Sequence, residues 1–305
     1  MAQFSIRQAV AFSVRAYFKH FLLFVGAGLL VGGSAWLSRT APRFVAQQLG
    51  IQMYITLPDD VSPILSDNGT PQSETAINKV KKVTSKIAFH INNVPKHHLF
   101  FIFLVMVVFS LLHFFTLLGL IRLTLEVRDK GVASVRHMMV SARNFFRFIG
   151  ASILFGLYFT CMFLGMSALT IPFALLCHAV CGSEDLTALI TIFVWVVLFI
   201  GLLFWTVGYV FMGFAIVDGA KVQGARQALR MSQTLVRGSR MKVMAVLVFV
   251  AFLLTVIFSV IQIALAYVQP GMLLAGKDVY QDGVAAIAAP IICLAVAYMY
   301  RAATK

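Results

Sequence analysis

Three arginines at helical spacing are the residues of this chain whose type and position best suit a chemical task. Arg226, Arg230 and Arg237 fall in one narrow arc when the stretch is placed on a helix at 100° per residue. Guanidinium groups bind phosphate oxygens through paired N–H donors. The pattern therefore predicts a surface that binds phosphate-bearing molecules, and the anionic headgroups of membrane lipids belong to that class.

The opposite arc of the same predicted helix is apolar or small, and it includes Leu229, Ser232 and Val236. A helix that is basic on one side and apolar on the other is typical of the boundary between membrane and water. We therefore expect an interfacial helix here. Arg240 and Lys242 follow it and extend the basic surface toward the next apolar run.

The same pattern recurs twice in the chain. Arg136 and Arg147 stand where Arg226 and Arg237 stand in the later copy, and Arg143 joins them. A weaker copy opens the chain. Each copy runs directly into an apolar span, so we expect three tandem units, each a basic interfacial helix followed by a hairpin of two membrane helices.

The composition is that of an integral membrane protein. Of 305 residues, 60% are hydrophobic and 12% are charged, and the mean hydropathy is +0.91. This leaves too little polar surface for a water-soluble domain of that length. A helix crosses the hydrocarbon core with about 20 apolar residues, and six runs meet this need, at about 20–37, 99–121, 148–172, 188–212, 243–268 and 283–300.

The predicted fold is therefore all-α, a polytopic membrane protein with a single membrane domain over residues 1–305. The apolar run 186–217 is longer than one span needs, so we expect it to tilt or to emerge from the bilayer. The one long polar region, 38–98, is expected on the outer side of the membrane. Apolar residues recur within it every three or four positions, which predicts an amphipathic helix at about 73–94.

Positive charge is concentrated on one predicted side of the membrane. With a cytoplasmic N-terminus, the segments 1–20, 122–147, 218–242 and 301–305 carry 17 Lys and Arg against three acids, Glu126, Asp129 and Asp218. By the positive-inside rule, both termini are then cytoplasmic. The same asymmetry explains the pI of about 10.0. A nucleic-acid partner would require a soluble basic domain, which the sequence lacks.

Residue types that perform catalysis or bind metals are sparse. Cys177, His178 and Cys181 form the one cluster with ligand-type side chains, but a closed zinc site needs four ligands. The predicted span interiors offer only His113 and Gln262 as polar groups suited to a relay, which disfavours ion-coupled transport. We expect no metal, no cofactor and no catalytic residue. Asp129 and Asp218 are instead expected to cap the positive ends of the interfacial helices.

The stretch from Phe211 to Val243 is similar to uncharacterised six-span bacterial inner-membrane families related to YciC and to the membrane domain of glycerophosphodiester phosphodiesterases. The residues that carry the resemblance are Asp218, Ala228, Leu229, Arg230, Ser232, Leu235 and Gly238, placed ahead of a new span. The resemblance implies a bacterial inner-membrane location. It supplies no catalytic residue, and segment 38–98 lies outside it.

Two functions remain open from the sequence. The first is a non-enzymatic membrane protein whose basic helices contact anionic lipid or a membrane or cytoplasmic protein partner. The second is a permease, or a flippase-like transporter, for a lipid or another hydrophobic molecule, with a cleft between hairpins. A polar cleft would favour transport, whereas a tightly packed bundle would favour the first function.

Overall fold

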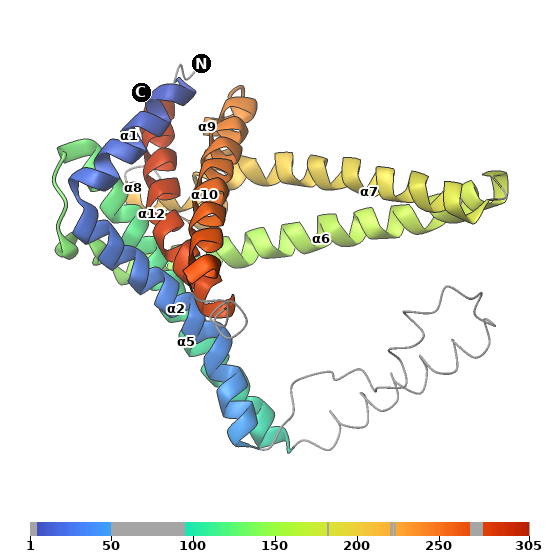
Figure 1. Ribbon diagram of the computed structural model, residues 1–305, viewed down its shortest axis with the longest axis horizontal. Coiled ribbons are helices and arrows are strands. Elements are labelled where there is room, and N and C mark those ends of the chain that lie inside the picture. The colour runs from blue at the N-terminus through green and yellow to red at the C-terminus, as the bar shows by residue number, and fades with distance from the viewer. Residues whose placement is uncertain are drawn as a thin grey trace. The chain divides into compact units, whose positions relative to one another are not determined.

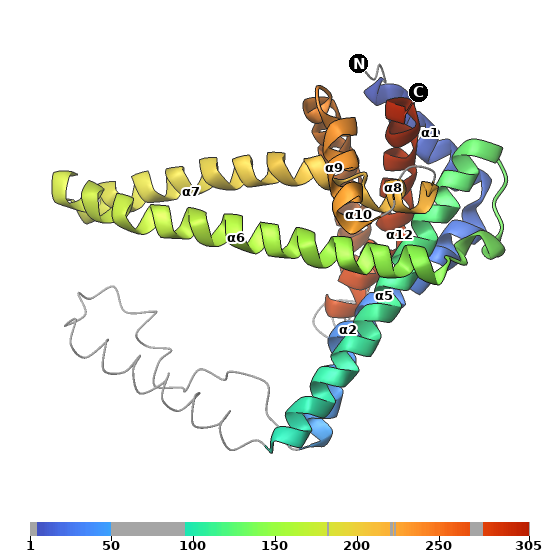
Figure 2. The same ribbon diagram turned by 180° about the vertical axis from the view of Figure 1, so that it is seen from behind.

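The computed structural model describes residues 5–49, 95–181, 183–219, 222, 224–268 and 277–304. Within these ranges every regular element is a helix, as the sequence predicts (Figures 1 and 2). The amphipathic helix predicted at about 73–94 lies outside the described residues. In chain order the elements are α1 (Ile6–Lys19), α2 (Phe21–Gln48), α5 (Lys96–Lys130), the 3-10 helix η1 (Val135–Met138), α6 (Ala142–Cys181), α7 (Glu184–Thr206), the 3-10 helix η2 (Val207–Tyr209), α8 (Met212–Asp218), α9 (Ala225–Val236), α10 (Arg240–Val268) and α12 (Lys277–Thr304).

Among the described residues, six helical runs are long and apolar enough to cross a membrane, in agreement with the six runs found in the sequence. Each run overlaps one predicted span, and most extend beyond it because the helical backbone continues into the polar flanks. The chain thus has the build of a multi-pass membrane protein. The runs are Phe21–Gln48, Lys96–Lys130, Ala142–Cys177, Leu186–Asp218, Arg240–Ile257 and Ala286–Thr304.

The chain separates into two compact units. Unit 1 comprises residues 1–33 and 114–305, and unit 2 comprises residues 34–113. The boundary falls inside α2 and α5 and not in linkers, so it differs from an ordinary domain boundary. The single membrane domain over 1–305 stays a prediction. Within unit 2, the Ser34 hydroxyl lies 3.2 Å from Nδ1 of His113, so this imidazole has a hydrogen-bonding partner.

Helix neighbours in unit 1 follow the chain in part. Helices α6 and α7 lie side by side as a hairpin (Figures 1 and 2), and α10 packs against α12. Helix α1 also packs against α12, where the Phe12 and Tyr298 rings lie 5.4 Å apart. The grouping of these pairs into three repeated hairpin units stays a prediction.

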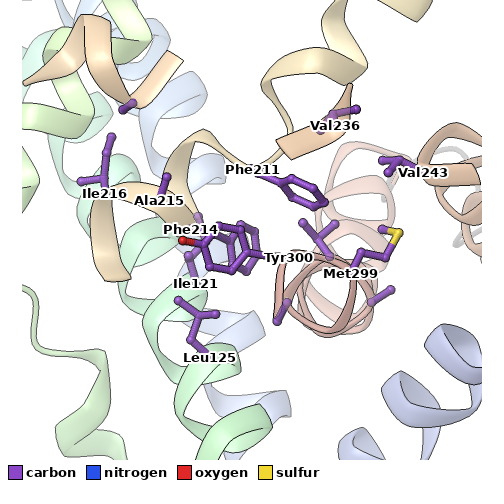
Figure 3. Packing of buried hydrophobic residues seen from close by; sticks show 14 of the residues in the cluster. Ile121, Leu125, Phe211, Phe214, Ala215, Ile216, Val236, Val243, Met299 and Tyr300 are labelled. Carbon is purple, nitrogen blue, oxygen red and sulfur yellow. The ribbon is translucent and has the colours of Figure 1, made fainter. Parts of the chain in front are cut away.

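The core of unit 1 is formed by aromatic and aliphatic side chains of α1, α5, α6, α8, α9, α10 and α12, and Figure 3 shows part of it. Tyr300 of α12 is fully buried, and its ring lies 5.7 Å from Phe211 and 5.9 Å from Phe214. Val236 and Val243, one at the end of α9 and one near the start of α10, are also fully buried. Helix α9 is therefore part of the folded core.

Two helices of unit 1 approach closely at Gly28. A Cβ atom built on Gly28 of α2 would stand 2.0 Å from the carbonyl oxygen of Ala286 and 3.2 Å from Cγ of Pro290, both in α12. Only a residue without a side chain fits here. Small residues at such crossings allow membrane helices to pack backbone against backbone.

Candidate functional site

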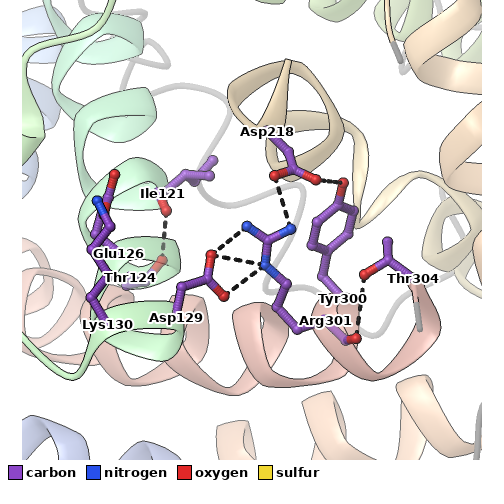
Figure 4. A network of polar contacts seen from close by, with 9 residues as sticks. All are labelled: Ile121, Thr124, Glu126, Asp129, Lys130, Asp218, Tyr300, Arg301 and Thr304. Carbon is purple, nitrogen blue, oxygen red and sulfur yellow. Dashed lines mark hydrogen bonds and ion pairs between the residues drawn. The ribbon is translucent and has the colours of Figure 1, made fainter. Parts of the chain in front are cut away.

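The C-terminal ends of α5, α8 and α12 meet at Arg301 (Figure 4). Its Nε donates to both carboxylate oxygens of Asp129, at 2.9 and 3.1 Å, and its Nη2 also donates to Asp129 Oδ2. Its Nη1 lies 2.8 Å from Oδ1 of Asp218. The Tyr300 hydroxyl donates to Oδ2 of the same aspartate at 3.0 Å. One guanidinium thus joins helix ends that are distant in sequence.

All three acids of the predicted cytoplasmic segments are engaged in ion pairs. Asp129 and Asp218 bind Arg301, while Glu126 Oε2 lies 2.8 Å from Nζ of Lys130, four residues later in α5. These three carboxylates are therefore paired with Arg301 and Lys130 and not with the arginines of α9. This leaves a strong excess of positive charge on the basic segments.

These contacts overturn the capping prediction for the two aspartates. Asp129 lies in the last turn of α5 and Asp218 is the last residue of α8, so both stand at helix C-termini. The residue that precedes α9 as its N-cap is Gly224, which has no side chain to accept a hydrogen bond. The prediction was wrong because both acids end the preceding helices, whereas the helices that follow begin at the N-caps Ser134 and Gly224.

Helix α9 rests on the core through the face that the sequence predicts to be apolar. Ala228, Leu229 and Val236 of this face are 0%, 3% and 0% exposed. Ala228 and Val236 pack in the same cluster as residues of α5, α8, α10 and α12. This face of α9 is therefore covered by protein.

Ser232 attaches α9 to a break between α7 and α8. The long apolar run predicted at 186–217 is interrupted by η2, and the break frees backbone groups from their helical partners. The Ser232 hydroxyl donates to the Gly208 carbonyl at 2.9 Å and accepts from the Phe211 amide at 3.1 Å. A buried serine thereby pairs both groups.

The opposite face of α9 carries exposed arginines. Arg226 and Arg230 are one helical turn apart and both exposed. Arg237 is also exposed, but the helix ends at Val236 and Arg237 is its C-cap, with ψ 122°. The predicted arc of three arginines is therefore a pair on the helix and a third at its end. Among the described residues, no carboxylate forms an ion pair with any of them.

The second basic segment does not form a helix of its own. Gly131, with φ +67°, follows α5, and Arg136 then lies in the four-residue 3-10 helix η1. Arg143 and Arg147 lie in the first two turns of α6, which continues directly into its span. Arg136 and Arg143 are exposed, and Arg147 is half-buried. The alignment of the copies missed this difference because it compares residue types and not backbone conformation.

Arg240 and Lys242 begin α10 and differ in their surroundings. Lys242 is exposed. Arg240 is half-buried, and its guanidinium carbon lies 5.8 Å from the centre of the Phe204 ring of α7. Its Nε is buried and has no hydrogen-bond partner among the residues described. The structure therefore separates Arg240 from the exposed arginines of α9.

The specific contacts of two arginines were missed at the sequence level. Arg301 was counted only as charge near the terminus. Arg128 of α5 was likewise counted as part of a charged segment, yet its guanidinium carbon lies 5.2 Å from the Phe12 ring and 4.8 Å from the Tyr298 ring. The sequence did hold one signal for these contacts, which is the scarcity of acids. Where few carboxylates stand among many cations, each carboxylate is expected to pair with a particular cation.

The described part of the chain contains no group of three or more His, Cys, Asp or Glu side chains placed to hold a metal. Cys177 is a free thiol. The side chains of His178 and Cys181, which complete the cluster seen in the sequence, lie outside the described residues, as does that of Gln262. The expectation that no metal or cofactor binds stays a prediction.

No protein-family model, no curated protein and no solved structure matches this chain. The similarity to the six-span inner-membrane families therefore stays a prediction. The function has to be argued from the site itself.

Proposed function

We propose that this protein is a non-enzymatic integral membrane protein that binds anionic phospholipid headgroups on the basic surface formed by Arg226, Arg230 and Arg237. The observation that carries the proposal is the state of the acids. Asp129, Asp218 and Glu126 are all paired with Arg301 or Lys130, so none of these three carboxylates competes with a lipid phosphate for the exposed arginines.

The position of α9 supports lipid as the source of those anions. The helix ends at Val236, and the membrane-spanning α10 begins only four residues later at Arg240. Such closeness in sequence keeps the arginines near the height of the headgroups. A basic side chain near an anionic leaflet gains about 1 kcal/mol, so three together give useful retention without a deep pocket.

The rigidity of the helix also supports binding. Because its other face is buried in the core, Arg226 and Arg230 are held at a fixed spacing before any lipid arrives. Less conformational entropy is then lost on binding than with a disordered basic tail. A differently folded segment adds positive charge through Arg136, Arg143 and Arg147. We propose that this charge also attracts anionic headgroups.

We also propose a bacterial inner-membrane location with both termini cytoplasmic. The charge asymmetry of the sequence supports this orientation through the positive-inside rule. Contacts that join the helix ends near both termini are consistent with it, since the Tyr298 hydroxyl of α12 lies 3.3 Å from Oε1 of Gln8 in α1. The anionic cytoplasmic leaflet would then face the arginines of α9.

The test is native mass spectrometry of the detergent-purified protein offered phosphatidylglycerol and phosphatidylcholine in equal amounts. Wild type should retain phosphatidylglycerol preferentially. Changing Arg226, Arg230 and Arg237 together to Gln should remove most of that preference while the fold stays intact. Unchanged preference in the variant contradicts the proposal, and preserved lipid binding with loss of a co-purifying protein would point to a protein partner instead.

Transport, the other function left open by the sequence, would use a polar cleft between hairpins. Two grooves are described beside α6 and α7, and both are lined mainly by apolar and aromatic side chains. The lining of these two grooves does not favour transport of a polar solute. We propose the binding function, which the exposed arginines of α9 support.

A further inference from the structure

We infer that the groove between α6 and α7 is a lipid site, in which one acyl chain of an anionic phospholipid lies along α6 while Arg240 binds the phosphate. This inference rests on the proposed affinity for anionic lipid but assigns it to a different place and to different residues. The groove would hold a single lipid in a defined position, whereas the arginines of α9 form an open surface.

The groove is a lipid-sized space with an apolar lining. Its volume is about 600 Å³. The α6 side chains that line it are largely exposed, and Leu169, for example, is 70% exposed. The space is therefore open toward the surroundings of the helix pair and can be entered sideways from a bilayer. Its lining residues are Tyr158, Cys161, Met162, Gly165, Met166 and Leu169 of α6, with Trp205 and Tyr209 from α7 and η2.

Polar groups gather at one end of the groove. The ring of Phe155 lies 6.1 Å from that of Trp205 and 5.1 Å from that of Tyr209, which places those two residues beside the early part of α6. Tyr158 follows within one turn. Beyond it the α6 lining is apolar as far as Leu169. An amphipathic molecule would therefore place its polar part at the Tyr209 end.

The length of the groove suits one acyl chain. The lining of α6 runs from Tyr158 to Leu169, which at 1.5 Å per residue covers about 17 Å. One leaflet is half of a hydrocarbon core of about 30 Å, or about 15 Å. A chain that starts at the headgroup level and lies along α6 would thus reach the middle of the membrane.

Arg240 supplies the charge at the polar end. Its Nη2 would lie 3.7 Å from a Cβ atom built on Gly208. Gly208 directly precedes Tyr209, which lines the groove. The Gln233 amide donates to the Tyr209 hydroxyl, which orients that end of the groove. Nε of Arg240 is buried and so is out of reach of a ligand. The Nη nitrogens of this half-buried side chain are the donors that would bind a phospholipid phosphate near the Tyr209 end of the groove.

The chemistry of the site favours a lipid over a second copy of the chain. A helix of another protein would fill the groove with apolar side chains but would bring no anion to the Arg240 guanidinium. A single anionic phospholipid satisfies both features. It provides an apolar chain for the groove and a phosphate oxygen for the guanidinium.

The test fills the groove with a side chain. No atom stands within 4 Å of a Cβ placed on Gly165, which lines the groove, or on Gly156. These glycines are nine residues apart in α6, so they lie on opposite faces of the helix. Gly165→Leu would occupy the groove, and Gly156→Leu is its matched control. Binding of phosphatidylglycerol and phosphatidylcholine to each purified protein is measured by native mass spectrometry.

We expect Gly165→Leu to lower the binding of both lipids at this site about tenfold and Gly156→Leu to behave as wild type. Arg240→Gln should keep phosphatidylcholine binding at this site, while the preference of this one site for phosphatidylglycerol falls about tenfold. Equal binding by the two leucine variants would overturn the assignment, and so would an unchanged preference in Arg240→Gln. The variant in which Arg226, Arg230 and Arg237 are changed to Gln should still bind one lipid in the groove. If this variant loses only the lipid bound at the surface of α9, the two proposals are distinguished.

Discussion

Arg301 binds Asp129 with two nitrogens of its guanidinium and uses the third to reach Asp218. The three side chains belong to α12, α5 and α8, so the contact joins the last helix to two earlier parts of the chain. It also removes two of the few acids from the basic segments. A single structural contact thereby shapes both the packing of unit 1 and its electrostatic surface.

Replacing Arg301 with Lys should weaken this junction although the charge is kept. An ammonium group cannot bind two carboxylates with a planar fork of donors. Because the three side chains are partly exposed, we expect a loss of about 1 kcal/mol, seen as a lower thermal midpoint in detergent. Arg143→Lys, at an exposed arginine, is the control and should leave the midpoint unchanged. Equal midpoints for both variants would show that the junction contributes no stability.

Ser232→Ala should destabilise the protein more than other serine or threonine truncations in α9. The change leaves the Gly208 carbonyl and the Phe211 amide without the hydroxyl that pairs them. Two unpaired buried groups cost about 2–4 kcal/mol. Thr234→Ala is the matched control, because the Thr234 hydroxyl is exposed and donates only to Arg230 in its own helix. Similar denaturation curves for the two variants would contradict the importance of this attachment.

Gly28→Ala should loosen the contact between α2 and α12. The new methyl group would stand 2.0 Å from the Ala286 carbonyl oxygen, so the helices must separate. Overpacking of this kind costs about 1–3 kcal/mol. Gly26→Ala adds the same group in the same helix, where nothing lies within 4 Å. Thermal unfolding of the two purified variants checks the prediction, which fails if Gly28→Ala is as stable as Gly26→Ala.

Tyr17→Phe should change how stability depends on alkaline pH. The Tyr17 side chain in α1 is buried, its hydroxyl has no hydrogen-bond partner among the described residues, and burial raises its pKa above 10.0. When the pKa of a group is higher in the folded than in the unfolded protein, the group contributes its full stabilisation at pH values below the unfolded-state pKa. That stabilisation is lost as the pH rises above the unfolded-state pKa. Wild type should therefore lose more stability than Tyr17→Phe above about pH 10. Parallel pH profiles of the thermal midpoint would contradict this.

Much of the fold was predictable because the length of an apolar run determines whether it can form a membrane-spanning helix. Each run of about 20 apolar residues has few alternatives to a membrane helix. The buried face of α9 was also predictable, since Leu229 and Val236 recur at the helical period. The different backbone of the basic segment around Arg136 was not predictable, because Gly131 and the 3-10 helix η1 interrupt that segment.

The contacts of the candidate site could be predicted only in part. Arg226 and Arg230 are exposed, as their periodicity indicates. The partner of Asp218 could not be found, because Arg301 is distant in sequence and meets it only through tertiary packing. Ser232 resembled any small residue in an apolar arc. Its importance depends on the break at η2, which a continuous apolar run does not reveal.

The measurement that tests the central claim most directly is the lipid composition around the protein when it is extracted from its membrane in copolymer nanodiscs. Wild type is compared with the variant in which Arg226, Arg230 and Arg237 are all changed to Gln. The control changes Arg39, Arg43 and Lys96 to Gln, which removes the same charge from residues outside the predicted basic surface. We predict that the fraction of anionic phospholipid falls toward the bulk value in the first variant only. An equal fraction in all three proteins would contradict headgroup binding by the arginines of α9.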